Sequence, residues 1–322
     1  MSFAKAKTWT RLLLRAAVVL AVLWLILLVP ALLLGRGITR GAQVAYMSDQ
    51  PGNWDIFVLD MTTRLTRRLT TADGDDRYPA WSNDGLQIGY HSNTESTYDL
   101  MLMDFDGRNP RMLPISQRFQ FSQEAMIAWS PDGEYISYHS DAGGYWNLYL
   151  SDPAGETAFQ VTFNPEEDIR MNWSPDGKMV AFASGRDGAG LEVYVLSVEE
   201  MLRFPRAGEI YARRLTDNFD DDWHPVWSPD GTQIAFISRR DLNSEIYIMD
   251  RFGREQRNLT NTVAVEEQHP VWTSDGTGLI FSANRHGTDD LFLLTLATGE
   301  IRRLTFDNRG NEQAPALWWP QG

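Results

Sequence analysis

The chain has 322 residues and no cysteine, which excludes disulfide bonds, thiol catalysis and a lipid-modified cysteine. Its 29 basic and 43 acidic residues give a formal net charge of −14. A field of this sign repels nucleic acid and anionic lipid, so we expect no nucleic-acid partner. Cationic, neutral or divalent-metal partners are favoured for the folded part.

The N-terminal part is basic and apolar, unlike the rest. A stretch of 19 residues without a charge runs from Ala16 to Leu34, and as a helix it would span roughly 28 Å. Basic residues flank it and no acid occurs in the first 42 residues. The positive-inside rule then predicts a single-pass membrane protein with a cytoplasmic tail at 1–11 and a signal-anchor helix at 12–34. A linker at 35–42 would lead to a domain that is periplasmic or extracellular, of the bacterial type.

The alternative for the apolar stretch is a cleaved signal peptide. It is disfavoured because the stretch exceeds the usual length of such a region and no clean small-x-small cleavage site follows it.

One pentapeptide recurs through the remainder of the chain at intervals of 44 to 54 residues. Its five copies share Trp, Asp and Gly and are Trp81–Gly85, Trp129–Gly133, Trp173–Gly177, Trp227–Gly231 and Trp272–Gly276. A degenerate sixth copy contains Trp318. Repeats of this length with a turn signal in each are typical of propeller blades of four strands.

The unit around Trp227 shows the pattern of one blade. His224–Trp227 is predicted as a short inner strand, Ser228–Gly231 as a tight turn, Ile234–Ser238 as the second strand and Glu245–Asp250 as the third. In the turn, Pro presets φ, Asp bonds its own backbone and Gly supplies a positive φ. Arg257–Thr260 closes the unit as an outer strand. The second and third strands are apolar on both faces, as expected for blades packed between other blades.

The two ends of the repeat region complement each other. Val44–Ser48, Asp55–Asp60 and Arg67–Thr70 form three strands with no inner strand before them, and Ala314–Trp318 is an inner strand with nothing after it. Joining them completes a sixth blade and leaves no open sheet edge. We therefore expect an all-β, six-bladed propeller over 43–322.

The recurring sequences P-x-W-S-P-D-G, I-A-F-x-S, I-Y-x-x-D and R-x-L-T resemble the PD40 (WD40-like) repeat of TolB-like propellers over about 43–322. The resemblance implies the fold but says little about function, because the same propeller serves as a scaffold, as a regulatory domain of peptidases and in a few lyases. Neither the N-terminal domain of TolB nor a peptidase domain is expected in this chain.

A carboxylate stands three residues before the position of the Pro in every unit. These residues are Asp76, Glu124, Asp168, Asp222, Glu267 and Glu312. We expect them to ring one mouth of the central channel. They would either accept backbone N–H bonds that tie blades together or bind a cation or a basic peptide, with Ca²⁺ or Mg²⁺ favoured by hard oxygen ligands.

Two histidines, His224 and His269, occupy equivalent positions in neighbouring units, each two residues after an acid. This pattern predicts either polar residues of the channel wall or a transition-metal site for Mn or Zn. His91 and His139 share another strand position and are interpreted as packing residues.

The loops between second and third strands emerge at the same end as the acids. They carry residues for a contact surface, namely Trp54, Tyr98, Tyr145, Trp146 and Arg239. For Trp54 and Trp146, packing between blades is the alternative. A longer connection containing Val198–Phe204 is a further candidate partner site.

No G-x-S-x-G, H-E-x-x-H or P-loop occurs, so we assign no catalytic residue and no cofactor. The sequence favours a scaffold that uses the acidic face of the propeller to bind a protein or peptide partner in the cell envelope. The alternative is a metal-dependent lyase or hydrolase with its site at the channel mouth.

Overall fold

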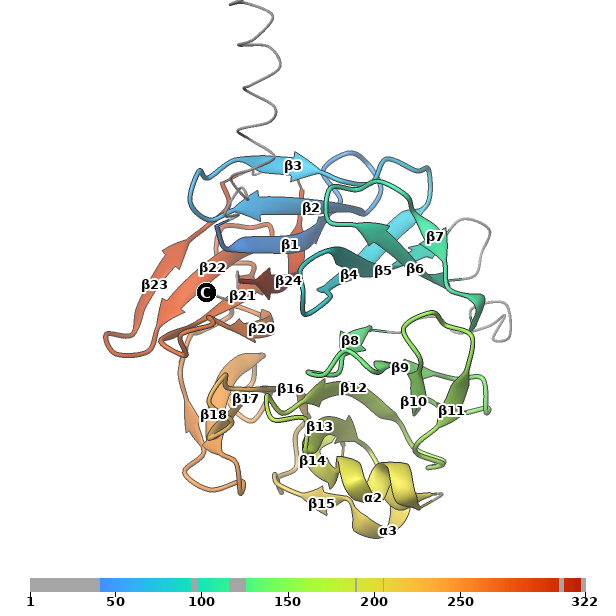
Figure 1. Ribbon diagram of the computed structural model, residues 1–322. Helices are drawn as coiled ribbons and strands as arrows, with labels where there is room; N and C mark the ends of the chain where they lie inside the picture. The colour runs from blue at the N-terminus through green and yellow to red at the C-terminus, as the bar shows by residue number, and fades with distance from the viewer. Residues whose placement is uncertain are drawn as a thin grey trace, which may run out of the picture. The chain divides into compact units, whose positions relative to one another are not determined.

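The computed structural model describes residues 41–93, 98–115, 126–188, 190–204, 206–306 and 310–319. Residues 42–321 form one compact unit. Within it, six antiparallel sheets of four strands surround a common centre, which confirms the predicted six-bladed propeller (Figure 1). The predicted basic tail and signal-anchor helix lie outside the described residues.

Each blade has an inner, a second, a third and an outer strand. The inner strands are β4 (Asp75–Trp81), β8 (Ala128–Trp129), β12 (Asp168–Trp173), β16 (Asp222–Trp227), β20 (Glu267–Trp272) and β24 (Glu312–Trp318). The second strands are β1 (Gln43–Ser48), β5 (Gln87–Asn93), β9 (Ile136–Ser140), β13 (Met179–Ser184), β17 (Gln233–Ser238) and β21 (Gly278–Ala283). The third strands are β2 (Asp55–Asp60), β6 (Tyr98–Asp104), β10 (Asn147–Ser151), β14 (Glu192–Ser197), β18 (Glu245–Asp250) and β22 (Asp290–Thr295). The outer strands are β3 (Thr66–Arg68), β7 (Arg111–Met112), β11 (Ala158–Gln160), β15 (Arg213–Arg214), β19 (Arg257–Asn258) and β23 (Glu300–Arg303).

The ring closes as the sequence predicts, because β24 pairs with β1 in a sheet of order β24-β1-β2-β3. The register places Val44 opposite Leu317. The indole of Trp318 lies 6.0 Å from that of Trp81, measured between ring centroids, and so joins the last inner strand to the first repeat. The closing strand begins at Glu312, two residues earlier than predicted, and β16 likewise begins at Asp222 rather than His224.

The recurring pentapeptide forms the same turn in successive blades. Ser228 Oγ donates to Asp230 Oδ1 over 2.6 Å and accepts from the backbone N–H of Gln233 over 2.9 Å. Gly231 has φ of 68°, which only glycine adopts readily. These contacts reverse the chain between an inner strand and its second strand, so all such turns lie at one end of the propeller.

Every inner strand except β8 carries an irregularity near its middle, where the pairing with the second strand skips. At this point of each strand, one residue other than glycine has a backbone in the left-handed conformation, with φ between 50° and 59°. These residues are Tyr78, Arg170, His224, His269 and Ala314. A bulge of this kind re-aims a side chain. It is the position of the two predicted histidines.

The core lies between blades rather than in one central mass. One cluster, for example, joins Ala181 and Val195 of one blade to Trp227, Phe236 and Met249 of the next. The connection from β14 to β15 carries two short helices, α2 (Val198–Arg203) and α3 (Ala207–Tyr211). Met201 of α2 is buried and ties this insertion to the blade.

Candidate functional site

The propeller has two chemically different ends. We call the end where the inner strands begin the acid end, since the predicted carboxylates lie there. We call the opposite end, which holds the Trp-Ser/Thr-x-Asp-Gly turns, the turn end. Because the strands are antiparallel, the loops between second and third strands also lie at the acid end.

The predicted carboxylates at the acid end are buried. The side chains of Asp168, Asp222 and Glu267 are fully buried. Each carboxylate forms an ion pair with an arginine from the loop that follows the second strand of its own blade. The pairs are Asp168–Arg186 at 3.0 Å, Asp222–Arg240 at 2.6 Å and Glu267–Arg285 at 2.7 Å. Asp76 and Glu312 are buried as well, whereas Glu124 lies outside the described residues.

Burial dominates the electrostatics of these acids. It raises the pKa of Asp76, and it raises the pKa of Asp222 despite the neighbouring Arg240. The pKa of Glu267 is raised to about 7, first by burial and further by Glu245, which together outweigh Arg285. Carboxylates so enclosed and paired hold the loops of their blades. Their predicted role in binding a cation or basic peptide stays a prediction. So does the alternative of backbone N–H bonds that tie blades together, because the three ion pairs with arginine each lie within one blade.

A second set of buried acids, which the sequence reading missed, begins the third strands. Asp55 pairs with Arg68 at 2.6 Å, and Asp290 pairs with Arg303 at 2.6 Å. Glu192 pairs with Arg214 at 2.7 Å. The arginines stand at the x position of the R-x-L-T sequence of the outer strands, and the second Arg in these three copies was the signal that could have revealed the pairs.

The five residues predicted as a contact surface divide into two groups. Trp54 is partly buried with the guanidinium of Arg77 5.5 Å from its ring, and Trp146 packs on His139 with ring centroids 5.4 Å apart. Tyr98 is partly buried near His91. Tyr145 is 55% exposed and Arg239 is exposed, so these two are available at the acid end.

The bulge residues bring Arg170, His224 and His269 together inside the ring. Arg170 Nη1 lies 3.3 Å from His224 Nδ1 and donates to the sulfur of Met126 over 2.8 Å. The rings of His224 and His269 lie edge to face with centroids 5.2 Å apart. Tyr78 lies on the other side of His269, 6.0 Å away between centroids.

This arrangement gives the predicted metal site no support. Among the residues that the structure describes, no group of three His, Cys, Asp or Glu side chains is placed to hold a metal ion. The guanidinium beside His224 would repel a cation, and Asp222 and Glu267 are engaged by arginines. The metal site stays a prediction without a complete set of ligands in the described part of the chain.

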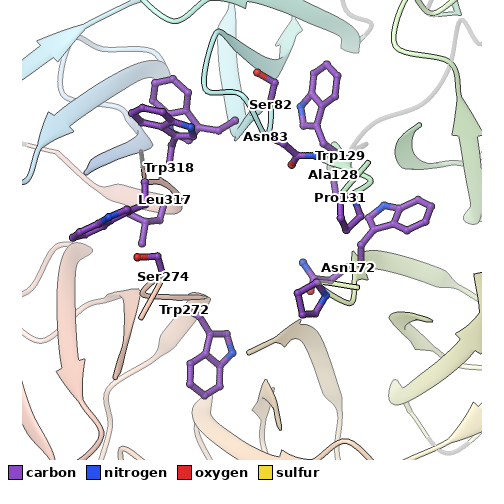
Figure 2. A pocket seen from close by; sticks show the side chains of 14 residues that line it. Ser82, Asn83, Ala128, Trp129, Pro131, Asn172, Trp272, Ser274, Leu317 and Trp318 are labelled. Carbon is purple, nitrogen blue, oxygen red and sulfur yellow. The ribbon is translucent and has the colours of Figure 1, made fainter. Parts of the chain in front are cut away.

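An open cavity of about 450 Å³ lies at the turn end instead (Figure 2). Its wall is made of Trp, Pro, Ser and Asn side chains from several blades, among them Trp129, Pro131, Asn172, Trp272 and Ser274. Figure 2 shows these side chains around a central opening. The last two tryptophans, Trp318 and Trp319, also line it, and Trp319 is 51% exposed. We call this space the turn-end cavity.

The polar groups of the turn-end cavity are not all used by the fold. Asn172 accepts a hydrogen bond from the backbone N–H of Trp227 over 2.9 Å with its side-chain oxygen. Its amide nitrogen has no hydrogen-bond partner among the described residues, so a donor remains for a ligand. Sequence reasoning missed this cavity because the tryptophans served only as markers of the repeat. The available signals were the extra Trp319, Asn83 within one copy of the motif and Asn172 directly before another.

In the described part of the chain, no helix has the length and apolar character needed to span a membrane.

Comparisons with known proteins agree on the fold. The sequence matches the PD40 family, described as the TolB beta propeller domain, over residues 91–241 and 212–322. TolB from Acinetobacter baumannii is similar in structure, with a TM-score of 0.73 and 20% identity, covering 87% of this chain and 67% of that one. A putative TolB from Agrobacterium tumefaciens has a TM-score of 0.66 and 21% identity, covering 85% and 92%.

More distant structures share the architecture. Oligogalacturonate lyase from Vibrio parahaemolyticus has a TM-score of 0.53 and 12% identity, covering 82% of this chain and 73% of the lyase. No curated protein matches the sequence. At these identities the structural likeness shows the fold alone.

Proposed function

We propose that this chain, which belongs to the family of TolB beta-propeller domains, is a non-catalytic binding module that holds an extended segment of a protein partner in its turn-end cavity. The observation that carries this proposal is the turn-end cavity itself, open at the surface and about 450 Å³ in volume. This volume lies within the range of about 300–1,000 Å³ that is usual for ligand sites.

The lining chemistry suits a polypeptide. Tryptophan supplies large rigid contact area and dominates the energetics of many interfaces, and aromatic grooves bind extended Pro-rich chains. Trp129, Trp272 and Trp319 provide such surfaces, while the amide of Asn172 offers a donor to a backbone carbonyl. The lining residues contribute contact and hydrogen bonding rather than an acid, a base or an activated nucleophile.

We further propose that residues 12–34 anchor the propeller in a membrane outside the cytoplasm, as their apolar sequence and the flanking basic residues favour. The full chain should then stay in the membrane pellet after washing with alkaline carbonate. A chain from which residues 1–41 have been deleted should be released, and release of the full chain by the wash would contradict the anchor.

The binding site can be tested with two exposed aromatic residues, one at each end. Trp319 at the turn end is 51% exposed and Tyr145 at the acid end is 55% exposed, so both can be removed with little effect on folding. An octapeptide library is passed over the immobilised full chain, and the retained peptides are quantified by mass spectrometry. We expect Trp319→Ala to lower retention about tenfold, while Tyr145→Ala leaves it unchanged.

The opposite pattern, with loss on Tyr145→Ala alone, would place the site at the acid end and contradict the proposal. Retention that neither variant changes would also contradict it. Thermal unfolding of both variants serves as the control that the propeller is intact.

A further inference from the structure

A second cavity continues the turn-end cavity toward the middle of the channel. It has a volume of about 270 Å³ and shares Asn83, Trp129 and Asn172 with the first. Arg170 and His224 belong to its wall but not to that of the turn-end cavity, so they mark its deeper part. We call this second space the inner cavity.

Arg170 is a cation without a carboxylate partner among the residues that the structure describes. Among the described residues, every ion pair involves some other basic residue. The contacts of Arg170 are instead with Met126 and His224, both through Nη1. Among the described residues that line the two cavities, Arg170 is also the one with a charged side chain. In a chain of net charge −14, the channel therefore holds a local positive centre.

The neighbouring histidines carry no charge of their own beside Arg170. Burial lowers the pKa of His269 to about 3 and that of His224 well below its usual value, and the charge of Arg170 lowers both further. Both rings are therefore neutral at physiological pH. The guanidinium thus remains the charge that a ligand meets there, in surroundings where water screens it less than at the surface.

We propose that the inner cavity binds a carboxylate at the end of the partner segment, with Arg170 as the residue that recognises it. This inference rests on the proposed function, because the segment reaches Arg170 through the turn-end cavity. The planar guanidinium matches a carboxylate with two parallel hydrogen bonds, and the free amide nitrogen of Asn172 is a further donor along the path. A chain terminus reaches the deeper part of such a channel most readily, so the free C-terminus is the source we favour.

The test compares two octapeptide libraries on the immobilised full chain, one with free C-terminal carboxylates and one with C-terminal amides. A charged hydrogen-bond pair corresponds to a preference of at least about tenfold for the free acids. Arg170→Gln should remove the preference. Arg239→Gln should keep it, because this variant loses the same charge from an exposed arginine that lies over Trp223 at the acid end.

Equal retention of acids and amides by the unaltered chain would overturn the inference, and so would a preference that survives Arg170→Gln. The first result needs no variant and holds even if Arg170→Gln folds poorly. Amidated peptides that end in Asp or Glu form a third arm. Their retention at the level of the free acids would support the carboxylate site and assign it to a side chain.

The results that would contradict the proposed function differ from those that would contradict only the role of Arg170. If neither library is retained more by the unaltered chain than by Trp319→Ala, the turn-end cavity does not bind peptides at all. If both are retained equally well and depend on Trp319, the binding module stands and only the role of Arg170 is lost.

Discussion

The acid end and the turn end of the propeller are built from the same repeat but use their polar groups in different ways. At the acid end, Asp168, Asp222 and Glu267 are buried and bound to arginines of their own blades. At the turn end and inside the channel, Asn172 and Arg170 keep donors that the described part of the fold does not use. A carboxylate repeated in every blade can therefore serve the fold, while the residues that vary between blades supply a site.

The largest effect is expected when one of the acid-end pairs is broken. Arg240→Ala would leave Asp222 buried without its ion-pair partner, and such a loss typically costs about 3–5 kcal/mol of the free energy of unfolding. Denaturant unfolding of the purified full chain measures it. The control is Arg203→Ala, whose partner Glu199 is 82% exposed, and its cost should stay below about 0.5 kcal/mol.

Equal and small costs for the two variants would show that the acid-end pairs do not hold the loops of their own blades, and the contrast between the ends would disappear.

A smaller effect on the free energy of unfolding is expected when a β-carbon is added next to Trp318 at the turn end. Gly85 and Gly133 occupy the same position of the turn with φ of 65° and 74°, so alanine at either pays a similar backbone cost. A β-carbon at Gly85 would overlap the indole of Trp318, whereas nothing lies within 4 Å of one at Gly133. Gly85→Ala should therefore cost about 1–3 kcal/mol more than Gly133→Ala.

Thermal unfolding and tryptophan fluorescence measure this pair of variants. Identical unfolding temperatures would mean that Trp318 does not pack against the first repeat, and the closing strand would have to lie elsewhere.

The last effect, which is the smallest when taken per pH unit, concerns the pH dependence of stability. The pKa of Glu267 is about 7 in the folded chain and near 4.5 in the unfolded chain, so the folded state binds the proton more tightly. Its contribution to stability is fully present below about pH 4.5 and is lost as the pH rises through 7. Relative to Glu267→Gln, the unaltered chain should lose stability over this range by at most about 1.4 kcal/mol per pH unit.

Unfolding curves of the two chains at several pH values measure the difference between the slopes. Parallel pH profiles would show that burial does not raise the pKa of Glu267 in the folded chain.

Much of the fold followed from the sequence because its determinants are local. The Ser-Pro-Asp-Gly turn carries its own hydrogen bonds, and the unmatched first and last strands could be joined in only one way. The left-handed bulge at His224 could not be foreseen, because a residue before proline ordinarily takes an extended conformation. It moves the start of the inner strand to Asp222 and turns the His224 side chain into the channel wall.

The burial and ion pairing of the acids at the acid end were harder to predict, because their arginine partners lie in loops whose sequences differ between blades. Asp168–Arg186, Asp222–Arg240 and Glu267–Arg285 are each separated by 18 residues, a regular spacing that points to pairing once the strands are aligned. The site at the turn end was missed for another reason. Whether Trp129 and Asn172 fill a core or line a cavity depends on how six blades meet, which no single repeat encodes.

Photo-crosslinking in living cells shows at which end of the propeller the partner binds. Benzoylphenylalanine is placed at Ser274 in the turn-end cavity or at Arg239 at the acid end, both exposed positions of the full chain. We predict that irradiation gives a covalent protein adduct from position 274, and that Trp319→Ala suppresses it. Adducts from position 239 with none from position 274 would show that the partner binds at the acid end and not in the turn-end cavity.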